Sequence, residues 1–192
     1  VEPINWGIED KQHWAIIGPN GAGKTLLIDI LTGKYALKSG QIIYPKGQSL
    51  SSIVKSVAFS DIYSLTDIKN SYYQQRWNAG DEHEAPIVSE LFAKGEKEWV
   101  KFLVNAFGIH DLIDKPINLL SSGELRKTLI VRSLLNKPRI LILDNPFIGL
   151  DTKSRGILND VLQKLSLLEN LQIVLILSNP KDIPTFITDI LP

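Results

Sequence analysis

The feature that most constrains the fold is a glycine-rich string that directly follows a short apolar run. Residues 13–17 read HWAII, and Gly18–Thr25 reads GPNGAGKT, which fits a glycine, four residues and then Gly-Lys-Ser/Thr. A helical pattern of apolar residues follows over 24–31, with Gly33 as its predicted end. A strand, a glycine-rich loop and a helix in this order predict a loop whose backbone N–H groups surround a phosphate.

The residue types in this loop suit a nucleoside triphosphate and its metal ion. Glycine lets the backbone turn its N–H groups inward, and the start of the following helix adds positive potential. The lysine can reach the β- and γ-phosphates, and the threonine hydroxyl suits Mg²⁺. Because the string lies where this mechanism needs it, we favour a nucleotide site over a chance turn. Its predicted contacts are Asn20, Gly21, Ala22, Gly23, Lys24 and Thr25.

Two further apolar runs predict a mainly parallel sheet. Residues 139–143 end at Asp144, and residues 172–177 end at a Ser-Asn-Pro turn. These runs are continuously apolar rather than alternating, which is typical of strands covered by helices on both faces. Residues 41–44 and 54–60 are weaker strand candidates. The predicted class is therefore α/β, with a P-loop NTPase core of mainly parallel sheet flanked by helices.

The middle of the chain predicts a helical insertion into this core. The strand pattern disappears between residues 62 and 115, and helical patterns occupy 99–107, 122–135 and 152–168. We predict a single domain of residues 1–192, in which a helical subdomain over 62–130 interrupts a core formed by 1–61 and 131–192. We also expect four phenylalanines to lie in the core: Phe102, Phe107, Phe147 and Phe186.

Composition excludes several other classes of function. The 21 basic and 21 acidic side chains give a net charge of 0, which, without a basic stripe, argues against a nucleic-acid partner. The absence of cysteine excludes disulfides, thiolate zinc sites and cysteine nucleophiles. No apolar run approaches the ~18–20 residues of a membrane span. The chain starts at Val1 and lacks methionine, so we expect a processed chain or a fragment.

Two other strings add to the nucleotide site. Asp144 follows four apolar residues, which would deliver a carboxylate to the sheet edge where ligands bind and support Mg²⁺; the alternative is a turn-forming aspartate. Residues 120–124 read LSSGE before an amphipathic helix, and hydroxyls with free N–H groups at a helix start suit an anion. An ordinary N-cap would explain one serine but not the whole string.

These motifs, in this order, resemble the ATP-binding domain of ABC (ATP-binding cassette) proteins. The family pattern is a P-loop, a Leu-Ser-Gly-Gly-Gln-like signature and an apolar strand that ends in Asp; residues 149–151 (GLD) match the loop after that strand. The resemblance covers nearly the whole chain. Within the family, Trp14 and the run YYQQRW at 72–77 are most similar to tandem ATP-binding proteins of the molybdate-transport type.

The resemblance implies a two-lobed ATPase that uses ATP and Mg²⁺ and pairs head to tail with a second ABC ATP-binding domain. By position, Thr25 and Asp144 support the metal. The signature residues that would face the partner's γ-phosphate are Ser121, Ser122 and Gly123. Trp6 is a candidate for the adenine-stacking aromatic, with an ordinary core or surface tryptophan as the alternative.

The chain departs from the family pattern at the positions linked to hydrolysis. Asn145 stands where the family has the glutamate that polarises the attacking water, and Asn179 stands where a histidine senses the γ-phosphate. The glutamine expected after the middle strand is absent, with Ser60 or Asp61 in that region. A neutral amide cannot take a proton, and loss of a general base costs ~10²–10⁴-fold in rate. The predicted catalytic set is Lys24, Asp144, Asn145 and Asn179.

These departures leave two functional readings open. In the first, the domain energises transport with separate membrane permease subunits, from the cytoplasm or as a peripheral protein on the inner face of the plasma membrane. Its own site then hydrolyses ATP slowly, in an asymmetric pair or as an ordinary homodimer with a lowered rate. In the second, it is a non-transport switch or regulatory tandem protein, in which ATP-driven closure matters more than turnover.

Overall fold

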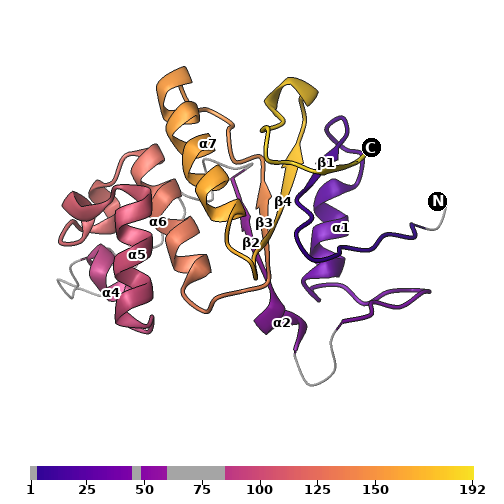
Figure 1. Cartoon of the computed structure of the whole chain (residues 1–192), viewed down its shortest axis with the longest axis horizontal. Helices are drawn as coiled ribbons and strands as arrows, with labels where there is room; N and C mark the ends of the chain where they lie inside the picture. The colour runs from indigo at the N-terminus through magenta and orange to yellow at the C-terminus, as the bar shows by residue number, and fades with distance from the viewer. Residues whose placement is uncertain (1–3, 45–48, 60–84) are drawn as a thin grey trace, which may run out of the picture.

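A parallel sheet forms the centre of the computed structural model, which describes residues 4–44, 49–59 and 85–192 (Figure 1). The strand order is β2-β3-β4-β1-β5, and every neighbouring pair is parallel. The strands are β1 (Trp14–Ile17), β2 (Val54–Ala58), β3 (Ile140–Asp144), β4 (Gln172–Leu177) and β5 (Asp189–Leu191).

The register brings the ends of β1, β3 and β4 to one edge of the sheet. Ile17 pairs with Leu177, and Asp144 pairs with Ile176. Because the strands are parallel, the segments that follow these three ends all begin on the same side. The P-loop and Asp144 therefore share the edge at which open α/β sheets bind ligands.

Helices pack on both sides of this sheet (Figure 1). Leu141 and Leu143 of β3 belong to the larger apolar cluster, whereas Ile142 belongs to a smaller one with Ile28 of α1. Alternate residues of one strand thus face opposite covered sides, which explains the continuously apolar runs. The helices are α1 (Lys24–Leu31), α2 (Leu50–Ile53), α4 (Val88–Phe92), α5 (Lys97–Phe107), α6 (Ser122–Leu134) and α7 (Thr152–Ser166), with 3₁₀ turns η1 (His110–Leu112), η2 (Ile117–Leu119) and η3 (Pro180–Asp182).

The structure confirms the predicted α/β class and its three strong strands and corrects several details. In the part of the chain that the structure describes, residues 41–44 form no strand: they belong to none of the strands of the sheet, and Ile43 is 82% exposed. The 54–60 strand is shorter, since β2 ends at Ala58. Phe102 is 43% exposed and stacks on Trp99, so its prediction as a core residue is wrong.

The helical insertion is described only in part. Within 85–134 the regular elements are α4, α5, η1, η2 and α6, whereas 62–84, including the run YYQQRW, lie outside the described residues, as do Ser60 and Asp61. The subdomain boundaries at 62 and 130 stay a prediction. Among the helices that are described, none has the length and apolar character needed to span a membrane.

Candidate nucleotide-binding site

The glycine-rich loop connects β1 to α1 and takes a conformation that depends on two glycines. Gly21 and Gly23 have φ angles of 85° and 87°, a region that side chains with a Cβ rarely enter. A Cβ at either position would meet nothing within 4 Å. The requirement for glycine is therefore conformational rather than steric, and it sets the turn that leads into the start of α1.

Lys24 curls back over this loop. Its Nζ donates to the carbonyl oxygens of Gly18 at 2.6 Å and of Pro19 at 2.8 Å. The ammonium group thus lies against the loop backbone. An anion bound in the loop could accept hydrogen bonds from this ammonium group, which would then release the two carbonyls.

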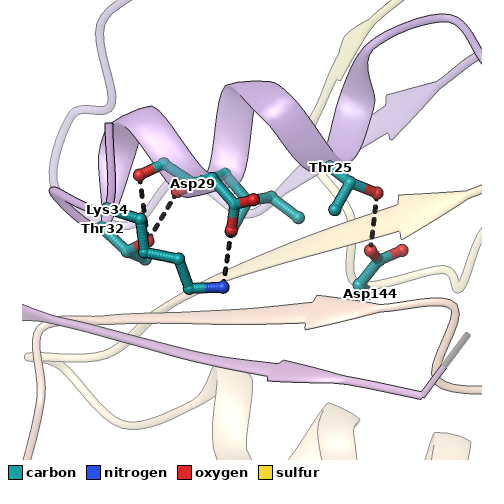
Figure 2. A network of polar contacts seen from close by, with 6 residues as sticks. Thr25, Asp29, Thr32, Lys34 and Asp144 are labelled. Atoms are coloured by element: carbon teal, nitrogen blue, oxygen red, sulfur yellow. Dashed lines mark hydrogen bonds and ion pairs between the residues drawn. The ribbon is translucent and has the colours of Figure 1, made fainter. Parts of the chain in front are cut away.

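Thr25 and Asp144 meet at the sheet edge although they are far apart in sequence. The Thr25 Oγ1 donates to Asp144 Oδ2 at 3.2 Å, as Figure 2 shows. Asp144 is 2% exposed, and burial raises its pKa, while hydrogen bonds from Thr25 and Asn145 and the charge of Lys24 act in the opposite direction.

This pair fits a Mg²⁺ ion. A hydroxyl and a carboxylate are the oxygen donors that Mg²⁺ prefers, and a cation would offset the cost of the buried negative charge. Within the described part of the chain, no group of three or more His, Cys, Asp or Glu side chains could hold a metal. The donor set therefore suits an ion that takes its other ligands from phosphates and water.

A chain of hydrogen bonds extends from Asp144 to the P-loop. The Asn145 Nδ2 donates to Asp144 Oδ1 at 2.9 Å, and its Oδ1 accepts from Ser178 Oγ at 3.2 Å. Ser178 Oγ also lies 3.0 Å from Asn20 Oδ1. One hydroxyl proton can serve only one of these oxygens at a time. Asn145 has a φ of 52°, so its backbone holds a conformation that is uncommon for residues other than glycine.

Ser178 is a site residue that we did not predict from the sequence. It follows β4, whose last residue pairs with Ile17 of β1, so the register places it beside the P-loop. Asn179, which we predicted to be catalytic, lies outside the hydrogen-bond network described above. It is exposed, and its Oδ1 accepts from the Lys181 backbone N–H at 3.0 Å at the start of η3.

The signature string forms the start of α6. Ser121 is its N-cap: Ser121 Oγ accepts from the Glu124 backbone N–H at 3.3 Å, and Glu124 Oε2 accepts from the Ser121 backbone N–H at 2.7 Å. This backbone hydrogen bond is the main reason why the pKa of Glu124 is lowered. The N-cap alternative thus holds for Ser121, with Ser122 and Gly123 in the first turn.

The structure separates this helix start from the P-loop of the same chain. In Figure 1, α6 and α1 lie on opposite sides of the sheet. Beside the start of α6 is a groove whose lining includes Ser121, Gly123, Lys127 and Ser154. Hydroxyls, a lysine and a helix start suit an anionic group. Glu124 also lines the groove, with its carboxylate bound by the Ser121 N–H and by Lys115.

Trp6 packs against Trp14, with ring centroids 5.5 Å apart and the planes at 77°. Both rings contact the smaller apolar cluster. The structure therefore describes Trp6 as a packing residue, and its part in stacking adenine stays untested.

The strand, glycine-rich loop and helix, with a carboxylate at the same sheet edge, define a P-loop nucleotide-binding domain. The family model described as "ABC transporter" matches residues 1–148. The chain thus belongs to the ABC transporter family, as an ATP-binding domain, and the predicted family, ABC-type ATPase class and fold are confirmed.

Named relatives agree with this assignment. The ABC transporter ATP-binding protein ModF of Escherichia coli is 32% identical over 177 residues, which cover 91% of this chain and 35% of that protein. An uncharacterised ABC transporter ATP-binding protein of Schizosaccharomyces pombe is 29% identical over 98% of this chain and 41% of its own length. The chain therefore spans less than half of each of these relatives.

The structural comparison supports the fold alone. The CbiO1 structure from Clostridium perfringens, described as part of the ABC transporter complex CbiONQ, has a TM-score of 0.70 and 24% identity. The match covers 97% of this chain and 74% of that one. The likeness therefore extends across the sheet and its covering helices.

Proposed function

We propose that this domain binds ATP with Mg²⁺ at Gly18–Thr25 and Asp144 and closes against a second ABC ATP-binding domain, with slow hydrolysis at its own P-loop. The observation that carries the proposal is the hydrogen bond between Thr25 and Asp144. It brings together, at the end of a P-loop, two oxygen ligands that would hold a Mg²⁺ ion.

The residues of the loop have separable tasks in binding. The amides around Gly21 and Gly23 and the start of α1 hold the phosphates, and Lys24 moves from the loop carbonyls to the β- and γ-phosphate oxygens. Mg²⁺, held by Thr25 and Asp144, would neutralise charge on the phosphates during phosphoryl transfer.

The side chain of Asn145 supports slow hydrolysis. It is neutral: its Nδ2 donates to Asp144, and its Oδ1 lies within hydrogen-bonding distance of Ser178 Oγ. The remaining N–H can orient a water, but the amide cannot accept a proton from it. Asn179 accepts from the Lys181 N–H and adds no positive charge. Loss of the base alone corresponds to ~10²–10⁴-fold in rate.

The start of α6 supports pairing with another domain. The groove beside Ser121 and Gly123 is suited to an anion and lies across the sheet from this chain's P-loop. We assign it to the γ-phosphate held by a partner ABC domain, in a homodimer or a tandem protein. Because named relatives are ABC transporter ATP-binding proteins, we assign the pair to transport. Membrane permease subunits then hold it in the cytoplasm, on the inner face of the plasma membrane.

The alternative function is a non-transport switch whose ATP-driven closure is its output. The neutral side chain of Asn145 favours it, since a switch needs ATP binding rather than turnover. Steady-state phosphate release tests the slow site itself: tight ATP binding with near-zero release supports it, whereas robust Mg²⁺-dependent release from this domain would contradict it.

Replacement of Asn145 tests the cause of the slow rate. Asn145→Glu restores a proton acceptor, and we expect turnover to rise by roughly 10²-fold or more. Asn145→Gln is the matched control, because glutamine has the length of glutamate without its charge. This variant should give no increase in turnover. No gain from glutamate over glutamine would show that the base at this position does not limit the reaction.

A further inference from the structure

Two arginines from different helices hold the loop that follows Asn145. Arg126 of α6 donates through Nη1 to the carbonyl of Pro146 and through Nη2 to that of Ile148, both at 2.9 Å. Arg155 of α7 donates to the carbonyl between them, that of Phe147, at 3.4 Å. Three successive carbonyls of an irregular loop thus take their positions from side chains on α6 and α7.

Arg126 is the buried member of this pair. It is 1% exposed, and its guanidinium lies 5.0 Å from the centroid of the Phe59 ring. The Phe59 backbone N–H in turn donates to the Asp144 carbonyl at 2.9 Å. The guanidinium therefore contacts both segments that flank the metal-binding carboxylate: the chain after β2 and the loop after β3.

Burial of an arginine here has a cost that packing alone does not explain. Desolvation lowers the pKa of Arg126, because burial disfavours its charged form. An apolar side chain of similar size would fill the space without this cost. The arginine adds two directional hydrogen bonds, which fix the loop at a set distance from α6.

The same helix carries the signature. Arg126 lies one turn after the Ser121 cap and Gly123, where the proposed function places the partner's nucleotide. We propose that Arg126 is a positioning residue that connects the signature to the Asp144–Asn145 edge of its own chain, so that nucleotide engaged at one site sets the loop of the other. This inference rests on the proposed pairing of two domains.

A mixed dimer isolates this connection. In one subunit, Lys24→Ala empties the P-loop and leaves the signature intact. In the other subunit, Gly123→Asp leaves the P-loop intact and places a carboxylate where the signature would contact the partner's γ-phosphate. A Cβ added at Gly123 has no neighbouring atom within 4 Å, so the substitution fits the fold. Only the mixed pair can form a complete site for ATP and Mg²⁺. That site combines the P-loop of the Gly123→Asp subunit with the signature of the Lys24→Ala subunit.

The readout is amide hydrogen exchange in residues 145–150 of the isotopically labelled Lys24→Ala subunit. Its own P-loop is empty, so we expect ATP with Mg²⁺ to slow exchange at Ile148 and Leu150 by about fivefold or more, the lower end of typical coupling between sites. Arg126→Met in this subunit should abolish the slowing. Arg126→Lys keeps the positive charge but lacks the two parallel N–H donors of the guanidinium, so it should weaken the slowing of exchange. This variant provides the test if Arg126→Met does not fold.

Arg132→Met, an exposed position in the last turn of α6 and away from the signature, is the control and should keep the full effect. Slowing that survives both Arg126 substitutions would come from direct coverage by the partner and would overturn the inference, as would a mixed dimer without slowing. Failure of the mixed pair to form with ATP, measured by sedimentation, would instead contradict the proposed function.

Discussion

Lys24→Ala should weaken the response of this domain to ATP far more than it weakens the domain itself. In the structure Lys24 donates to two loop carbonyls, at 2.6 and 2.8 Å. These hydrogen bonds are partly exposed, so their loss should lower the free energy of unfolding by only about 1 kcal/mol. In the ATP complex the same ammonium group contacts phosphate oxygens, whose hydrogen bonds with a charged donor contribute about 1.5–3 kcal/mol.

The expected size of the effect follows from binding linkage. ATP at about 100 times its dissociation constant stabilises the folded state by about 2.7 kcal/mol, which for a chain of this size raises Tm by roughly 5–11 °C. If Lys24→Ala weakens binding about 100-fold, the same ATP concentration stabilises by only about 0.4 kcal/mol, and the Tm shift falls to roughly 1–2 °C. Thermal unfolding with and without ATP and Mg²⁺ measures both quantities.

Lys34→Ala is the matched control, because Lys34 lies just beyond the opposite end of the same helix. Lys34 pairs with Asp29 at 2.7 Å, an ion pair that Figure 2 shows on the same helix as Thr25. Its side chain is 66% exposed. An exposed ion pair contributes about 0–1 kcal/mol, so the control should change stability slightly and leave the ATP response intact. A full ATP response in Lys24→Ala would refute the assignment of this loop to phosphate.

Two further predictions concern groups whose roles the structure defines. Ser121→Ala should lower the free energy of unfolding by about 1 kcal/mol through loss of the α6 cap, whereas Ser122→Ala should stay within about 0.5 kcal/mol; equal effects in urea unfolding would contradict the cap. Burial lowers the pKa of His13, whose Nδ1 accepts from the Ile173 N–H while its Nε2 bonds to the Ser166 carbonyl. The folded state then binds a proton less readily than the unfolded chain, so stability should fall as pH drops below about 6.5. His13→Gln should flatten that decline, and an unchanged slope between pH 7.5 and 5.5 would argue against it.

Local patterns in the sequence were enough to predict the elements that carry the candidate site. Strand, loop and helix at the P-loop are consecutive, and the Ser121 cap and the end of β3 at Asp144 each depend on neighbouring residues. The arrangement of Thr25 against Asp144 then follows from the parallel register, which the continuously apolar strands indicate. The helix that follows the signature was equally predictable, because its apolar positions recur at helical spacing.

Features that depend on distant segments were not predictable in this way. Strand β5 has only three residues, and its pairing with β1 is visible only in the folded sheet. Ser178 acquires its role from Asn20 and Asn145, which come from two other loops. Phe102 looked like a core residue, yet it lies on the exposed side of α5, where it stacks on Trp99 one turn earlier.

The amide at position 145 does something that a glutamate could not. Its Nδ2 donates to Asp144 and so helps to hold a buried carboxylate whose pKa burial raises. A glutamate would set a second negative charge beside that carboxylate and disfavour ionisation of both until Mg²⁺ binds. Asn145→Glu should therefore raise turnover and also lower the stability of the nucleotide-free domain relative to Asn145→Gln. A glutamate variant that is less stable and more active would indicate that Asn145 favours nucleotide binding over hydrolysis. If the glutamate and glutamine variants are equally stable without Mg²⁺, the amide relieves no charge repulsion at Asp144.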